Sequence, residues 1–176
     1  MNIKIMNARP EDAKGIQEVY YKTWLDTYPN EEYNITRDDI EDSYKDSFSE
    51  ERLKKLSERI SSHPANIQYI VAKDGSNIVG VCQPIIFPDK NKLQTIYILP
   101  DYQGKGIGTK LWNEANKLFD PDKDTYVEVV VYNLKTISFY EKLGFKDTGR
   151  RFSEDRFKMK NGSILPEMEM CKKALP

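Results

Sequence analysis

Apolar residues alternate with polar ones at the start of the chain and then recur at helical spacing. Ile3 and Ile5 indicate a short first strand, and the helix that follows it is expected to end near Tyr28. Thr36 and Ser49 can act as the N-caps of two further helices. This first third of the chain therefore predicts one strand followed by three helices.

From residue 67 onward the apolar positions follow the period of strands, interrupted by two helical stretches. The elements expected here are strands over 69–72, 78–87 and 93–99, a helix over 106–119, a strand over 126–132, a helix over 136–143, a strand from 145 and a last strand over 164–171. Gly144 stands where a helix ends in a left-handed residue, and Asn161–Gly162 indicates a hairpin turn. The order predicts an α/β fold, with a mixed, mostly antiparallel sheet flanked by helices, in a single domain spanning 1–176.

The composition is that of a globular protein rather than a disordered or membrane-spanning one. The chain has 176 residues, of which 39% are hydrophobic and 31% charged, and its net charge is −1. A near-zero charge argues against a nucleic-acid partner. No apolar run approaches the ~20 residues that cross a bilayer, and the N-terminus lacks the apolar region of a secretion signal. We therefore expect a cytoplasmic protein with no nucleic-acid or membrane partner.

The residues that commonly bind metals are few and scattered. Cys82 and Cys171 lie far apart in the sequence, which makes a disulfide framework or a zinc site improbable. His63 is the only histidine and is expected in a surface loop. The sequence therefore predicts no metal cofactor.

A glycine-rich turn stands between a predicted strand and a predicted helix. It reads Gln-Gly-Lys-Gly-Ile-Gly-Thr over 103–109. Glycines let the backbone approach an anion closely, and the N–H groups and dipole of the following helix favour negative charge there. Counted from Gly104, the Walker and Rossmann patterns both require a glycine at position 109, where this chain has Thr109. Neither pattern therefore fits. The turn is interpreted as a pyrophosphate cradle of another kind, and a merely glycine-rich helix start is the plainer alternative.

Two motifs resemble those of the GNAT acetyltransferase superfamily. The segment 103–108 matches the signature Gln/Arg-x-x-Gly-x-Gly/Ala, and 96–100 before it resembles the family's fourth strand. The segment 133–145 is similar to the second motif, Asn-x-x-Ala-x-x-Phe-Tyr-x-x-x-Gly-Phe, with small-residue positions varied. The resemblance implies a GNAT-type sheet and transfer of an acetyl group from acetyl-CoA (coenzyme A) to an amine.

The resemblance also implies roles for individual residues. The backbone of the strand would pair with the pantetheine arm, the glycine turn would hold the pyrophosphate, and the second motif would contact the arm. The residues so implied are Ile96, Tyr97, Ile98, Gln103, Gly104, Lys105, Gly106, Ile107, Gly108, Thr109, Asn133, Ser138 and Lys142. Tyr140 would lie near the thioester sulfur.

The reaction requires a group that takes a proton and a group that stabilises the leaving thiolate. An alkylammonium has a pKa near ~10.4, so a base or desolvation must help it to lose a proton at pH 7. Glu128 lies in the otherwise apolar strand 127–131, where desolvation would raise its pKa towards that of a useful base. Residues 127–129, Val-Glu-Val, resemble the Leu-Glu-Val element that carries the base of ribosomal-protein alanine acetyltransferases, although Glu128 could also be a rim residue.

Tyr140 is expected to stabilise the thiolate by a hydrogen bond. A phenol of pKa ~10 would give its proton to a thiol of pKa ~8.5 only at a cost of roughly 2 kcal/mol. The oxyanion is expected to be held by a backbone N–H of 96–98.

Charge and aromatic residues near the N-terminus indicate a cationic acceptor. Segment 26–51 carries ten acidic and two basic residues, a net charge of −8 that leaves +7 for the remainder. Segment 23–28 resembles a helix end of PaiA-type polyamine acetyltransferases. Trp24, Tyr28 and Glu31 are therefore expected to bind a small amine such as spermidine or spermine. A solvated helix face would explain the same charges.

Two other functions fit the sequence. One is an N-terminal protein acetyltransferase, because Glu128 and Tyr140 would serve a peptide amine equally well. The other is a non-catalytic acyl-CoA-binding regulator. The sequence leaves open whether the protein is a monomer or a homodimer.

Overall fold

A computed structural model describes residues 2–62 and 64–174, so the expectation for His63 falls outside the described residues. The strands are β1 (Ile3–Asn7), β2 (Ile70–Asp74), β3 (Asn77–Ile86), β4 (Asn91–Ile98), β5 (Thr125–Val130), β6 (Lys146–Phe152) and β7 (Glu167–Lys172). The helices are α1 (Ala13–Thr27), α2 (Arg37–Tyr44), α3 (Glu50–Ser61), α4 (Ile107–Asn116) and α5 (Leu134–Lys142), with short 3₁₀ turns η1 (Pro10–Asp12), η2 (Pro100–Tyr102) and η3 (Asp155–Phe157).

The strands form one seven-stranded sheet in the order β1-β2-β3-β4-β5-β7-β6. Neighbouring strands are antiparallel except for β4 and β5, which are parallel. The expected mixed, mostly antiparallel sheet is confirmed. The hairpin order of the last strands, in which β7 lies between β5 and β6, was not anticipated.

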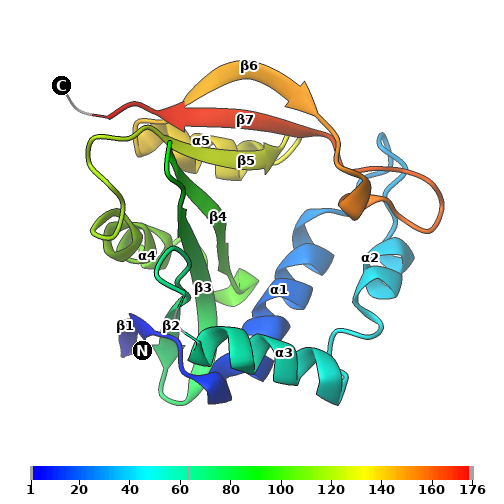
Figure 1. Ribbon diagram of the computed structural model, residues 1–176. Helices are drawn as coiled ribbons and strands as arrows, with labels where there is room; N and C mark the ends of the chain where they lie inside the picture. The colour runs from blue at the N-terminus through cyan, green and yellow to red at the C-terminus, as the bar shows by residue number, and fades with distance from the viewer. Residues whose placement is uncertain (1, 63, 175–176) are drawn as a thin grey trace.

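The sheet divides at its one parallel contact. β4 and β5 pair only from Asn91 with Thr125 to Leu93 with Val127, although both strands continue beyond that point. Figure 1 shows the two halves turned away from each other, with β5, β7 and β6 lying across the top and β3 and β4 standing upright below them. The divergence leaves one edge of β4 without a neighbouring strand.

Helices cover both faces of the sheet. One core joins α4 and the end of α5 to the sheet through buried residues such as Leu111, Trp112 and Phe145. A second core joins α1 and α3 to the opposite face of β2 and β3, with Ile16 and Val81 fully buried. A third, smaller core packs α2 and the end of α1 against the end of β5.

Local signals account for several helix boundaries. The Thr36 side chain accepts a hydrogen bond from the Asp39 N–H, and Ser49 caps α3 in the same way. Helix α5 begins two residues earlier than expected because Asn133 supplies its N-cap. Gly144 adopts φ +92° after α5, as expected for a left-handed C-terminal residue.

Both cysteines are buried and free. Burial raises the pKa of each thiol, which keeps Cys82 and Cys171 protonated. In the described part of the chain no helix is long and apolar enough to cross a membrane, and no cluster of three or more His, Cys, Asp or Glu is placed to hold a metal ion.

Candidate active site

A cleft of about 690 Å³ opens between β4 and β5 where their pairing ends. Most residues expected to hold coenzyme A line it, namely Ile96, Tyr97, Ile98, Gln103, Gly104, Gly106, Ile107, Gly108, Thr109, Asn133 and Lys142. Tyr28, Glu128 and Tyr140 line it too. Residues separated by more than a hundred positions in the sequence therefore meet in one cleft.

The glycine turn has the backbone conformation that an anion cradle requires. Gly104 and Gly106 have φ of +72° and +75°, in the left-handed region that side chains disfavour. A Cβ on Gly108 would lie 3.1 Å from Ile98 Cδ1 and 3.3 Å from Phe139 carbons, so glycine lets α4 approach the strand closely. The free N–H groups at the start of α4 are thereby presented to the cleft, which fits a pyrophosphate group.

The side chain of Gln103 ties the turn to its neighbours. Its Nε2 donates to the Ile98 carbonyl oxygen at 3.0 Å, and Lys135 Nζ donates to its Oε1 at 2.5 Å. Lys135 lies in the second motif and lines the cleft. Gln103 therefore connects the end of β4 to α5, which holds both cofactor motifs in a fixed relation.

The free edge of β4 and the N-cap of α5 define the walls for an extended ligand. On its other edge β4 pairs with β3, including Ile96 with Cys82, so its unpaired edge faces the cleft. The pantetheine arm, which carries amide groups, fits such an edge. Asn133 Oδ1 accepts from the Thr136 N–H at 3.2 Å, which leaves the Nδ2 group of this residue free to donate to the arm.

Two residues of the expected set do not line the cleft. The ammonium of the exposed Lys105 donates to the Asp101 carbonyl oxygen at 2.7 Å and lies over the Tyr102 ring. Ser138 lies outside the lining, because it falls between the positions of α5 that face the cleft, such as Thr136 and Phe139. For these two residues the expected contacts with coenzyme A lack support from the geometry.

The sequence reasoning also left out residues of the cleft wall. They are Thr23, Asp26, Thr27, Gln94, Thr95, Tyr102, Val129, Tyr132, Leu134, Lys135, Thr136 and Phe139. Those from 134 to 139 lie within the second motif, and their helical spacing could have identified them. The contribution of α1 depends on long-range packing that the sequence does not display.

Tyr140 is buried in the cleft wall at 4% exposure. Burial, with smaller contributions from Tyr97 and Cys82, holds the pKa of its phenol well above the ordinary value. Proton transfer to a thiolate is then even less favourable than expected from the sequence. A hydrogen bond donated by the phenol fits this environment better.

Aromatic residues at the C-terminal end of α1 meet β4 on the other side of the cleft. Tyr28 Oη lies 3.0 Å from Tyr97 Oη, and Trp24 Nε1 donates to Tyr97 Oη at 3.2 Å. Tyr28 lines the cleft, whereas Trp24 supports it from behind by packing against Tyr28 and Phe157. The expectation for Glu31 is not supported, because this residue is exposed in the turn after α1 and does not line the cleft.

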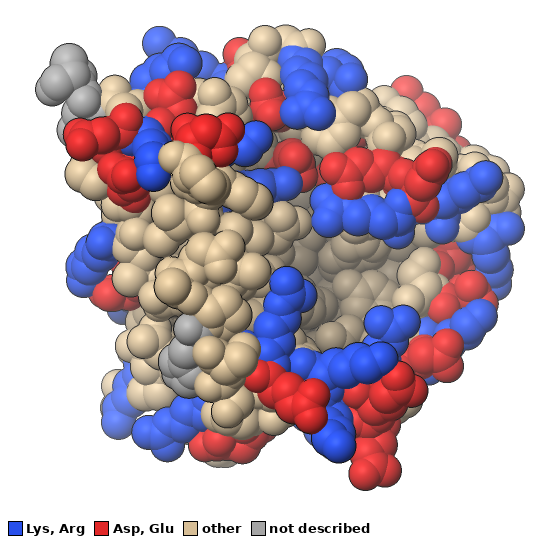
Figure 2. All heavy atoms as spheres, in the orientation of Figure 1, with Lys and Arg blue, Asp and Glu red and all other residues tan. Residues whose placement is uncertain are grey.

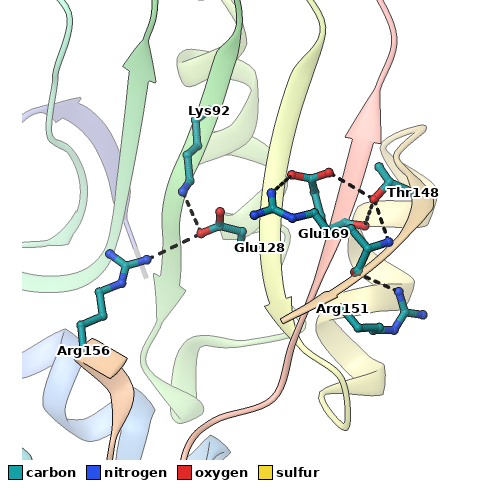
Figure 3. A network of polar contacts seen from close by, with 7 residues as sticks. Lys92, Glu128, Thr148, Arg151, Arg156 and Glu169 are labelled. Carbon is teal, nitrogen blue, oxygen red and sulfur yellow. Dashed lines mark hydrogen bonds and ion pairs between the residues drawn. The ribbon is translucent and has the colours of Figure 1, made fainter. Parts of the chain in front are cut away.

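Glu128 lies in an ionic environment, not in the apolar one expected from its strand. Figure 3 shows its carboxylate between Lys92 and Arg156. Lys92 Nζ is 2.7 Å from Glu128 Oε2, and Arg156 Nη2 is 3.6 Å from the same oxygen. Neighbouring residues in the strand are apolar, but they point to the opposite face of the sheet. Glu128 therefore has two cationic partners in place of the apolar surroundings expected from its strand.

Glu167 is a buried acid that the sequence reasoning missed. It is 6% exposed on β7, and its Oε2 has no hydrogen-bond partner among the described residues. Burial, together with the charges of Glu128 and Glu154, raises the pKa of Glu167 to about 7. In β7 Glu167 and Glu169 alternate with Met168 and Met170, and this period of two could have placed both acids on one face.

Comparison with known proteins assigns the family. A family model described as an acetyltransferase (GNAT) domain matches residues 26–163. This chain belongs to the GNAT acetyltransferases. The spermidine N(1)-acetyltransferase of Thermoplasma acidophilum is 30% identical in an alignment of 152 residues that covers 83% of this chain and 89% of that protein.

Solved structures agree with this assignment. A PaiA N-acetyltransferase from Thermoplasma acidophilum, crystallised in complex with coenzyme A, matches with a TM-score of 0.70 and 29% identity over 98% of this chain and 99% of that one. The ribosomal-protein-S18-alanine N-acetyltransferase of Escherichia coli has a TM-score of 0.64 at 14% identity, covering 99% and 96%, which shows a shared fold. This GNAT protein is an acetyl-CoA-dependent N-acetyltransferase.

Charges of both signs surround the hollow on one face of this GNAT fold. Figure 2 shows a hollow edged by Lys or Arg and Asp or Glu side chains together. A second cavity of about 580 Å³ between α1, α2 and α3 has a charged lining of Asp42, Lys45, Asp46, Arg52, Lys55 and Arg59. Two acids of segment 26–51, Asp42 and Asp46, therefore share this cavity with bases of α3.

Proposed function

We propose that the acceptor is a polyamine such as spermidine or spermine, acetylated on a primary amine. The main support is the 30% identity to a spermidine N(1)-acetyltransferase over most of both chains. A site for a second positive charge supports it further, because the exposed carboxylate of Asp26 lies in the cleft wall at the end of α1. The cytoplasmic location expected from the sequence stays a prediction.

In this proposal acetyl-CoA is the acetyl donor and lies along the free edge of β4. The amine approaches from the α1 side, where Tyr28 and Tyr97 line the cleft. Tyr140 donates a hydrogen bond to the departing thiolate, and a backbone N–H of β4 stabilises the oxyanion. A carboxylate on the acceptor side takes the ammonium proton, and Glu128 is the candidate that the sequence names.

A thiol-release assay with acetyl-CoA tests the acceptor. Spermidine and spermine are compared with propylamine, which has one amine only, and with peptides that begin with alanine. We expect kcat/KM for spermidine to exceed that for propylamine at least tenfold, with mass spectrometry identifying monoacetylated product. Turnover of peptides together with none of any polyamine would refute the proposal in favour of an N-terminal protein acetyltransferase.

A pair of variants tests the second charge site. Asp26→Asn should raise KM for spermidine several-fold and leave KM for propylamine unchanged, because only spermidine has a second ammonium to bind. Glu31→Gln, an acid of the same region that lies outside the cleft, should change neither value. Equal effects of the two substitutions would contradict a specific role for Asp26.

A further inference from the structure

Glu167 and Glu128 lie on the same face of the sheet. In the antiparallel pair of β5 and β7, Val130 is opposite Glu167, and Glu128 is opposite Glu169. Residues opposite each other share a face, as do residues two apart in one strand. The side chain of Glu167 therefore lies on the face that carries Glu128, which is the face covered by α1 and α2.

Charged groups from each neighbouring element act on Glu167. Glu128 on β5 and Glu154 before η3 contribute negative charge, while Arg156 on η3 and Lys92 on β4 contribute positive charge. The charge of Glu167 in turn acts on the phenol of Tyr97 in the cleft wall. Glu167 does not itself line the cleft, but it interacts electrostatically with two residues that do, Glu128 and Tyr97.

Glu128 and Glu167 differ in how their oxygens are occupied. Glu128 Oε2 is paired with both Lys92 and Arg156. Glu167 Oε2 is buried without a hydrogen-bond partner in the described structure, an arrangement that is costly unless a ligand or water supplies one. A buried carboxylate can accept a charge-assisted hydrogen bond, which a cationic donor such as an ammonium group favours.

We propose that Glu167, and not Glu128, accepts the proton that the acceptor ammonium loses before it attacks. Because Glu167 does not line the cleft, the proton passes to its carboxylate through a water molecule, which leaves a neutral amine and a carboxylic acid. The amine nitrogen then bonds to the thioester carbon, and the carbon–sulfur bond breaks. The second nitrogen proton goes to the thiolate, which hydrogen-bonds Tyr140, and Glu167 returns its proton to solvent.

The pH dependence of kcat/KM tests this assignment. For the unsubstituted enzyme we expect kcat/KM to rise with pH and bend near pH 7, because the carboxylate must be ionised to accept a proton. In Glu167→Gln the bend should disappear, and log kcat/KM should rise with unit slope as free amine becomes available. The loss should be about 10²–10⁴-fold at pH 7.5 and should shrink above pH 9.

Substitutions of the neighbouring charges provide matched controls. Glu128→Gln and Glu154→Gln should each move the bend to lower pH, because both acids raise the pKa of Glu167. Arg156→Gln should move it to higher pH, because Arg156 lowers that pKa. These opposite shifts do not depend on Glu167→Gln folding well.

Folding of Glu167→Gln is checked by its melting temperature. The pKa of Glu167 is raised in the folded state, so its ionisation destabilises the fold as pH rises from its unfolded pKa towards 7. The variant lacks this ionisation. The difference in melting temperature, variant minus unsubstituted protein, should therefore be larger at pH 8 than at pH 5.

Two results would overturn the assignment. One is a bend near pH 7 that persists in Glu167→Gln and is lost in Glu128→Gln. The other is a loss of activity in Glu167→Gln that is equal at all pH values. The inference rests on the proposed function only in requiring an amine acceptor, so it is measured with whichever amine turns over. Failure of polyamines as substrates refutes the polyamine proposal and leaves this test intact.

Discussion

Replacing Tyr140 with Phe removes one hydroxyl group from the cleft and keeps the ring. The ring contacts Phe139 and Phe145 at centroid distances of 5.5 Å each, and these contacts survive the substitution. A hydrogen bond to a charged group is worth about 1.5–3 kcal/mol. Because ~1.4 kcal/mol corresponds to tenfold in rate, kcat should fall about 10- to 150-fold.

The assay separates chemistry from binding. Single-turnover acetyl transfer reports the chemical step, and calorimetry reports the dissociation constant for acetyl-CoA, which should change less than about twofold. Tyr126→Phe, a matched loss of one hydroxyl on β5 outside the cleft, should alter neither value. A single-turnover rate for Tyr140→Phe within twofold of the unsubstituted enzyme would refute the role of the phenol. Since burial raises the pKa of Tyr140, its ionisation should cause no loss of rate below pH 10.

Two further pairs of substitutions test the cradle and the fold. Gly106→Ala forces a side chain into φ +75°, at a cost of about 1–2 kcal/mol, and should weaken acetyl-CoA binding ~5- to 30-fold by calorimetry. Gly75→Ala, at φ +61° in the β2–β3 turn, should lower the melting temperature but leave that binding unchanged; equal binding losses would contradict the cradle. Lys73→Met leaves the buried Asp12 carboxylate without its 2.6 Å partner and should cost about 3 kcal/mol of unfolding free energy in urea. Lys55→Met breaks a pair that is mostly exposed and should cost less than ~1 kcal/mol, so similar losses would contradict the importance of burial.

The elements that could be predicted from the sequence are those with local signals. The N-caps Thr36 and Ser49 mark two helix starts, and the glycines of segment 103–108 mark the cradle, because each effect acts within a few residues. The cofactor side of the cleft consists largely of two contiguous motifs. Most of its lining residues could therefore be predicted from the sequence. The direction of individual side chains could not, and Lys105, which turns away from the cleft, is an example.

The acceptor side could not be predicted in the same way. Glu128 appeared to lie in an apolar strand, but its two cationic partners come from elsewhere in the chain. Lys92 belongs to β4, and Arg156 belongs to η3, the 3₁₀ turn that follows β6. Glu167 is buried because β7 inserts between β5 and β6, a pairing order that periodicity does not specify. Charges that are distant in the sequence decide which carboxylate is paired and which is desolvated.

The position of the Lys92–Glu128 ion pair indicates why two carboxylates are present. The last paired residues of β4 and β5 are Leu93 and Val127, so the bond from Lys92 to Glu128 reaches across the point where the strands diverge. Both side chains are about 15% exposed, and a pair so placed is strongly destabilised when one partner loses its charge. If Glu128 took the ammonium proton, its ion pair with Lys92 would break during each turnover. The contact between β4 and β5 at the point where they diverge would then be weakened. Glu167 can take the proton without breaking an ion pair, which leaves Glu128 to hold the strands while the reaction proceeds.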